Sequence, residues 1–247
     1  RPISSAASDV YKRQVYILYS SGTTGVPKCI VHGSGNALIE QKKELSIHCD
    51  VKENDRVFYF TTTGWMMWNW QAAALSCGAS IYLYDGSPFF PSIDRLIDYA
   101  SKYKFTLFGV GAKYIDHLKN EKFNSKQFDL SNLRTITSTG SPLVSESFDY
   151  VYKHIKQDLH LSSISGGTDV VGCLVIGNIF QPVFSGEIQG SSLGIDIDIF
   201  DDSGKSVNDY EKGELVVKQP FPSMPVMFWN DPDAVSYTHL TLPTISV

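Results

Sequence analysis

The sequence predicts an α/β fold: a largely parallel, buried sheet with flanking helices. Short apolar runs typical of buried strands alternate with helical segments at least four times along the chain. Loops rich in Gly, Ser and Thr follow three of the strands, at 20–25, 138–142 and 165–169. Because open α/β sheets bind ligands beyond the carboxyl ends of their strands, we expect the second and third loops to share one site.

Each element follows from a local pattern. The helix at 93–100 has apolar residues at positions i, i+3, i+4 and i+7, and Gly78 is expected to end the helix at 65–75. The Lys and Glu residues of 40–44 are expected on a solvated helix face. Strands are expected at 15–19, 29–31, 56–60, 80–84, 105–110, 133–137 and 161–164. Helices are expected at 38–45, 65–75, 93–100, 112–119 and 148–155.

The pattern changes after Gly186. Isoleucine alternates with aspartate over 195–199, a turn follows at 202–205, and 213–218 forms a second strand, so a small β subdomain is expected. Two end segments lack sustained periodicity and look foreign to the domain. The expected division is a tail at 1–14, a partial α/β core at 15–185, a partial β subdomain at 186–233 and a tail at 234–247.

Composition narrows the function classes. With 43% hydrophobic and 19% charged residues, the chain has an ordinary globular mix, and a net charge of −5 argues against nucleic acid as a partner. No apolar run approaches the roughly 20 residues of a membrane span, and the first fourteen residues lack the apolar core of a signal peptide. The four cysteines are widely spaced without a C-x-x-C pair, which predicts reduced thiols and a cytoplasmic protein.

The loop between the first two strands predicts a polyphosphate site. Its glycines allow close backbone approach, its hydroxyls and amides donate hydrogen bonds, and its lysine adds positive charge. The spacing is not that of a Walker A loop, because Pro27 stands where that motif has glycine. A polar hairpin loop without a ligand is the alternative. The candidate residues are Ser20, Ser21, Gly22, Thr23, Thr24, Gly25 and Lys28.

Three further stretches are candidates for chemistry. Gly140-Ser141-Pro142 is either a ligand-contacting turn or a connector that leads into a helix. Thr168-Asp169, preceded by Gly166-Gly167, offers a hydroxyl and a carboxylate that suits Mg²⁺, or else caps a helix. The stretch 65–70 is dense in aromatic and Met residues and favours core packing, although its place after a Thr-rich turn also fits a pocket wall.

The ten positions 19–28 together resemble the phosphate-binding signature of the adenylate-forming superfamily, which includes acyl-CoA synthetases, peptide-synthetase adenylation domains and luciferases. The resemblance spans about 15–233. It implies that the loop and Lys28 hold the β- and γ-phosphates of ATP, and that Gly140, Ser141 and Pro142 lie beside adenine. It further implies that Thr168 contacts the α-phosphate and that Asp169 serves Mg²⁺.

The resemblance implies an ATP-dependent acid–thiol ligase that uses coenzyme A, and the sequence looks most like the branch that activates acetoacetate. Trp65, with Asn69 as a polar group, would line the acyl pocket. The sequence departs from the wider pattern at Asp169, where Glu is usual, and at Gly166 and Gly167, near which an aromatic residue is usual. Without an aromatic residue near Gly166 and Gly167, ordinary stacking on adenine is in doubt.

Two alternatives stay open. One is another short-chain acyl-CoA synthetase, of acetyl or propionyl type, or an amino-acid adenylation domain; the other is a noncatalytic nucleotide-binding module. The resemblance also implies that ribose-binding and lysine-bearing segments follow 233. We therefore expect this chain to be a fragment that is inactive alone.

Overall fold

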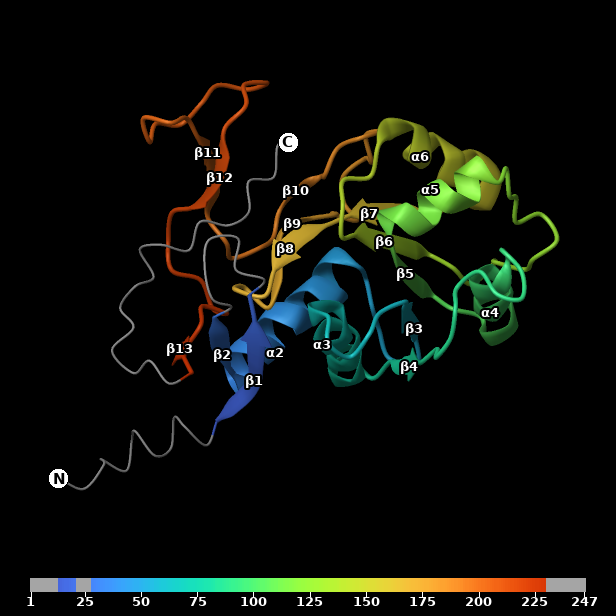
Figure 1. Ribbon diagram of the computed structural model, residues 1–247, viewed down its shortest axis with the longest axis horizontal. Helices are drawn as coiled ribbons and strands as arrows, with labels where there is room; N and C mark the ends of the chain where they lie inside the picture. Colours follow the sequence, from blue (N-terminus) through green and yellow to red (C-terminus); the bar gives the residue numbers. More distant parts are fainter. Residues whose placement is uncertain (1–12, 21–27, 230–247) are drawn as a thin grey trace.

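Five parallel strands form the central sheet, in the order β4-β3-β5-β6-β7 (Figure 1). The computed structural model describes residues 13–20 and 28–229. The parallel order confirms the predicted α/β fold. The strands are β3 (Arg56–Tyr59), β4 (Ser80–Tyr82), β5 (Leu107–Gly111), β6 (Thr135–Thr139) and β7 (His160–Ser163).

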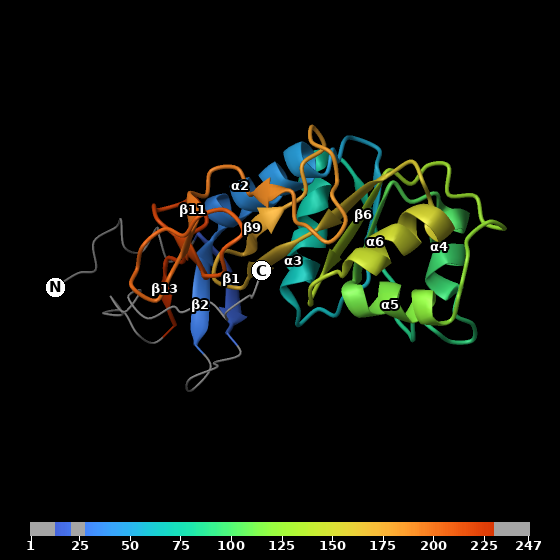
Figure 2. The same ribbon diagram turned by 90° about the horizontal axis from the view of Figure 1, so that it is seen from above.

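Helices cover both faces of this sheet. Figure 2 shows α4, α5 and α6 on one face and α3 on the other, which agrees with the two separate apolar clusters of the core. The helices are α2 (Ser34–Lys43), α3 (Met66–Ala73), α4 (Arg95–Tyr103), α5 (Ala112–Asn120) and α6 (Ser145–Tyr150). Single π-helical turns, Glu44–His48 and Val151–Ile155, extend α2 and α6.

The core beneath α4 follows the predicted apolar pattern. Leu96 and Ile97 are buried there against the sheet, as the i, i+3, i+4 spacing requires. Phe58 of β3 and Phe108 of β5 stack at 5.5 Å between ring centroids. Because Val57 packs on the opposite face, β3 shows the alternation expected of a strand buried on both sides.

The core beneath α3 contains the aromatic stretch. Met66, Met67 and Trp70 are buried, as core packing predicts. The helix continues through a 3₁₀ turn, Ala74–Cys77, and ends at Gly78, which adopts φ +77°. Only glycine takes that conformation without strain, so the predicted stop is confirmed.

The expectation of a solvated face at 40–44 is wrong for the glutamates. Glu40 is 1% exposed and Glu44 is 0% exposed, whereas the apolar Leu38 is 45% exposed. Helix α2 packs against α3 and the β9 strand, so this face turns inward. Glu44 accepts hydrogen bonds from Trp70 Nε1 at 2.7 Å and from Cys173 N at 2.6 Å. These long-range donors make the burial possible.

Besides the central sheet, the described residues form three smaller sheets (Figure 1). The first has the order β1-β2-β13, the second β10-β9-β8, and the third pairs β11 with β12; all pairings are antiparallel. Their bounds are β1 (Gln14–Tyr19), β2 (Cys29–Gly33), β8 (Ser165–Gly167), β9 (Gly172–Ile176), β10 (Gly190–Ser191), β11 (Ile197–Phe200), β12 (Glu214–Val217) and β13 (Met227–Phe228). The domain division at 185/186 stays a prediction.

Candidate active site

The predicted phosphate loop closes a hairpin between β1 and β2. Tyr19 pairs with Cys29, the Ser20 N–H donates to the Lys28 carbonyl at 3.0 Å, and the Lys28 N–H donates to Ser20 Oγ at 3.1 Å. Ser20 Oγ accepts in the last bond, so its own proton stays available to a ligand. The candidates Ser21, Gly22, Thr23, Thr24 and Gly25 lie outside the described residues.

The charged end of Lys28 lies near two groups. Its Nζ is 5.4 Å from the centroid of the Phe228 ring, a cation–π distance. Burial raises the pKa of Asp169, and the charge of Lys28 acts against this rise. The hairpin that bears the phosphate loop therefore brings its lysine toward the predicted metal ligand, although the two residues are far apart in sequence.

Thr168 and Asp169 lie in the turn of a second hairpin, between β8 and β9. Strand β9 follows the turn, so these residues do not cap a helix and that alternative is excluded. Thr168 is half-buried at the start of the turn. The sequence did not predict β8, because a Ser-Gly-Gly strand has none of the apolar alternation that marks one.

The Asp169 carboxylate has an unusual environment. Its Oδ1 atom is buried and has no hydrogen-bond partner among the described residues. Burial raises the pKa of Asp169, while a hydrogen bond to its own backbone N–H and the charge of Lys28 act in the opposite direction. Since a buried carboxylate oxygen without a partner is costly, this atom is suited to a bound cation.

Gly166 explains the departure from the usual aromatic position. A Cβ atom at Gly166 would lie 2.0 Å from the carbonyl oxygen of Gly172 on the paired strand. No side chain fits there without separating β8 from β9. At Gly167 a Cβ would make an ordinary contact, 3.5 Å from Asp169 Oδ2. The close pairing of β8 with β9 therefore leaves no room for an aromatic side chain at Gly166.

The Gly140-Ser141-Pro142 loop meets the aromatic stretch. A Cβ at Gly140 would lie 3.7 Å from the Trp65 ring, so the indole packs beside this loop. Trp65 stands at the start of α3, half-buried, with its ring edge-to-face on Tyr59 at 5.9 Å. The predicted acid-binding and adenine-side residues are thus neighbours.

The ends of β6 and β7 lie together, as expected of a shared site. Thr139 Oγ1 donates to the carbonyl of Ile164 at 2.8 Å, and the Ile164 N–H donates to the carbonyl of Ser138 at 2.9 Å. These bonds hold the 140–142 loop beside the start of the β8–β9 hairpin.

Asn69 lies one turn of α3 beyond Trp65 but is only 9% exposed. Its side chain forms a hydrogen bond with the Tyr16 hydroxyl of β1, whose pKa is raised mainly by burial. The Asn69 amide therefore bonds a residue of β1. In the sequence it lies one helical turn after Trp65.

Sequence reasoning missed the residues that hold the Thr168–Asp169 turn. One of them is His32, whose Nε2 lies 2.7 Å from the Thr168 carbonyl oxygen. The available signal is a polar residue at the end of the apolar run Cys29-Ile30-Val31, where a buried polar side chain needs a partner.

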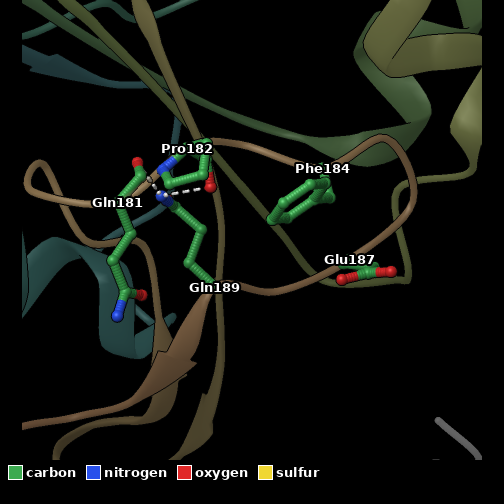
Figure 3. Close-up of a pocket in the computed structure, with 5 residues that line it drawn as sticks. All are labelled: Gln181, Pro182, Phe184, Glu187 and Gln189. Atoms are coloured by element: carbon green, nitrogen blue, oxygen red, sulfur yellow. Dashed lines mark hydrogen bonds between the residues drawn. The ribbon is translucent and has the colours of Figure 1, made fainter.

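A hollow of about 360 Å³ lies elsewhere, in the loop after β9 (Figure 3). It is lined by Gln181, Pro182, Phe184, Glu187 and Gln189, none of them a predicted site residue. Gln189 Nε2 donates to the carbonyls of Gln181 and Pro182 at 2.9 and 3.3 Å, so its amide is used to hold the loop.

The described parts of the chain lack two other features. No group of three or more His, Cys, Asp or Glu side chains is arranged there to hold a metal ion. None of the helices described has the length and apolar character that crossing a membrane requires.

Comparison with known proteins gives the family of the chain. Residues 7–225 match the AMP-binding enzyme family, and the chain belongs to it. It is 56% identical over 224 residues to an acetoacetyl-coenzyme A synthetase of Rhizobium meliloti (strain 1021), covering 90% of this chain and 34% of that protein. It is 47% identical over 228 residues to an acetoacetyl-CoA synthetase of Gallus gallus, covering 92% and 34%.

A solved structure is similar as well. Acetoacetyl-CoA synthetase from Streptomyces lividans superposes with a TM-score of 0.86 at 42% identity, covering 94% of this chain and 36% of that one. The chain thus spans about a third of the length of the curated relatives it matches.

Proposed function

We propose that this chain is part of an ATP-dependent acid–thiol ligase that forms acetoacetyl-CoA from acetoacetate. The main support is the buried Oδ1 of Asp169, which has no hydrogen-bond partner among the described residues and lies within the influence of the Lys28 charge. The similar proteins bear the name acetoacetyl-CoA synthetase and are about three times as long. We call the longer gene product to which we assign this chain the parent enzyme.

Asp169 suits Mg²⁺, a hard ion that proteins bind through one or two carboxylates together with substrate phosphates. When bound, the ion would neutralise phosphate charge and polarise the phosphoryl oxygens. Lys28 would share the charge neutralisation from the opposite hairpin. Both residues lie beside paired strands, Lys28 directly before β2 and Asp169 in the turn between β8 and β9.

The reaction proceeds in two steps. A carboxylate oxygen of acetoacetate attacks the α-phosphorus of ATP, and the bond to pyrophosphate breaks. The sulfur of coenzyme A then attacks the acyl carbon; AMP leaves with the bonding pair and the thiol proton passes to solvent. The loop 20–25 and Lys28 bind the β- and γ-phosphates, and the Thr168 hydroxyl orients the α-phosphate.

The remaining residues bind the base and the acid. Gly140, Ser141 and Pro142 contact adenine from one side, and the backbone of Gly166 and Gly167 contacts the nucleotide from the other. The acid lies against Trp65, whose contact with the 140–142 loop brings the carboxylate close to the nucleotide. Asn69 is the polar group of this pocket.

Acid-dependent ATP–pyrophosphate exchange in the parent enzyme tests the proposal. Acetoacetate should support the fastest exchange among acetate, propionate, acetoacetate and a set of amino acids. A preference for acetate or propionate would assign the chain to another short-chain synthetase. ATP binding without exchange for any acid would show a noncatalytic nucleotide-binding module.

Two further parts of the proposal concern the 247-residue chain and the compartment of the enzyme. We expect the 247-residue chain to bind nucleotide weakly and not to complete the reaction, since it spans only about a third of its relatives. Turnover near that of the parent enzyme would contradict this.

The four free cysteines, Cys29, Cys49, Cys77 and Cys173, support a cytoplasmic enzyme.

A further inference from the structure

Three buried side chains converge on the turn that bears Thr168 and Asp169. They come from distant parts of the chain, and each bonds a backbone carbonyl of the turn. The contacts are His32 Nε2 with Thr168 O at 2.7 Å, Ser223 Oγ with Val170 O at 2.6 Å and Gln41 Nε2 with Val171 O at 3.1 Å.

Burial makes these contacts significant. His32 and Gln41 are 1% exposed, and Ser223 is 0% exposed. Because a carbonyl oxygen only accepts, the histidine Nε2, the glutamine amide and the serine hydroxyl all donate. Losing any donor would leave a buried carbonyl without its partner.

The turn has a strained conformation that needs such support. Val171 adopts φ +50°, which is unfavourable for a β-branched residue. The next residue, Gly172, is enclosed: a Cβ there would lie 2.7 Å from Glu44 Oε1 and 2.9 Å from Glu40 Cγ. Glu44 in turn accepts the Cys173 N–H, which fixes the outgoing strand.

The same strand positions both charged groups of the site. His32 lies on β2, and Lys28 directly precedes that strand, so one short segment carries the lysine and also contacts the turn. Ser223 lies just before β13, which pairs with β2 and contributes Phe228 beneath Lys28. The distance between Lys28 and Asp169 is thus set by β2 and its side chains.

We propose that His32, Gln41 and Ser223 are positioning residues that fix the Asp169 carboxylate and the Thr168 hydroxyl relative to Lys28. The proposal rests on the proposed function, because it assumes that Asp169 binds the metal ion. Residues that orient a ligand from behind contribute about 10- to 100-fold to metal affinity in comparable sites.

The test measures Mn²⁺ binding to the parent enzyme in the presence of ATP, by electron paramagnetic resonance, together with the thermal midpoint. His32→Leu should weaken Mn²⁺ binding by about tenfold or more. His32→Gln keeps a donor at a similar reach and should restore most of the affinity. Ser223→Ala, a small change that the fold tolerates better, should weaken binding by about two- to tenfold, the effect of one hydrogen bond.

His48 provides a matched control. It is also a buried histidine whose ring bonds a distant carbonyl, that of Gly177 at 2.8 Å, but it does not contact the turn. His48→Leu should lower the thermal midpoint and leave the Mn²⁺ affinity of the folded protein within about twofold, since its loss is structural.

Two results would overturn the inference. One is unchanged Mn²⁺ affinity in both His32→Leu and Ser223→Ala; the other is equal weakening in His48→Leu. Asp169→Asn separates this inference from the proposed function. If Asp169→Asn weakens Mn²⁺ binding and the other variants do not, only the positioning role fails; if Asp169→Asn has no effect, the metal role itself fails.

Discussion

The two faces of the central sheet are built from different chemistry. Beneath α4, α5 and α6 the core consists of aliphatic and aromatic side chains such as Leu96, Phe58 and Phe108. Beneath α3 and α2 the apolar core is joined by two buried carboxyl groups, Glu40 and Glu44. The first face contributes stability through burial, and the second also fixes strands that lead into the candidate site. Substitutions on the first face should therefore change mainly stability, and substitutions in the site that the second face supports should change mainly activity.

The largest expected effect is on the apolar face. Leu96→Ala removes a fully buried side chain and leaves a cavity, so the free energy of unfolding of the parent enzyme should fall by about 2–5 kcal/mol. Its kcat/KM for ATP, expressed per folded molecule, should not change. Denaturant unfolding and exchange kinetics measure both quantities, and a parallel loss of kcat/KM would remove the distinction between the faces.

The reverse pattern is expected at the β8–β9 turn. Asp169→Asn should lower kcat/KM for ATP by about 10²- to 10³-fold, because it removes a charge that acts on the phosphates. The thermal midpoint should change little, since Oδ1 has no partner to lose among the described residues. The exposed Asp158→Asn is the control and should leave both quantities unchanged. Simple unfolding, with normal activity per folded molecule, would return Asp169 to a structural role.

The buried carboxyl pair makes stability depend on pH. Burial, and then the neighbouring Glu40, raise the pKa of Glu44 to about 8, while Lys43 acts in the opposite direction. The buried thiols of Cys49 and Cys173 face the same carboxyl group, and their pKa values are raised as well, chiefly by burial. At neutral pH the folded protein therefore holds a proton on Glu44 that the unfolded chain would release.

The sign of the pH effect follows from this shift. Because the pKa of Glu44 is higher in the folded state than its ordinary value of 4.5, its stabilising contribution is complete below about pH 4.5 and is lost as the pH rises toward 8. Glu44→Gln should flatten this decline. It should also lower the free energy of unfolding by about 1–3 kcal/mol, because an amide group would face either the Trp70 or the Cys173 N–H donor. Unfolding measured from pH 5 to 8 tests both; an unchanged slope in the variant would contradict the assignment.

The smallest expected effect concerns specificity. Trp65→Ala opens the wall between α3 and the 140–142 loop, so the ratio of kcat/KM values for acetoacetate and longer acids should change by about tenfold. Exchange assays with acids of increasing length measure this ratio in the parent enzyme. An unchanged ratio combined with lower stability would place Trp65 in the core only.

The elements that the sequence predicted well are those determined by local pattern. The apolar spacing in α4, the stop at Gly78 and the buried runs of β3 and β5 all act within a few residues. The parallel sheet follows from their alternation, and the 19–28 stretch was recognisable because its residues are contiguous.

The parts that escaped prediction depend on distant partners. Glu44 appeared solvated because its partners, Trp70 and Cys173, lie 26 and 129 residues away. The local sequence left the Thr168-Asp169 pair open between a helix cap and a metal site, and only the β8–β9 pairing excludes the cap. His32 and Gln41 bond carbonyls more than 100 residues away, and a local pattern can at most indicate that a side chain needs a partner, not which partner it has.

A double-mutant cycle between Lys28 and Asp169 tests the central claim most directly. The claim is that residues from two separate hairpins act on one nucleotide, and kcat/KM for ATP in acid-dependent pyrophosphate exchange is the quantity to measure. If Lys28→Ala and Asp169→Asn act on the same phosphates, the double variant should lose much less activity than the product of the two single losses. Losses that simply multiply would show that the two residues act independently, and would contradict a shared site.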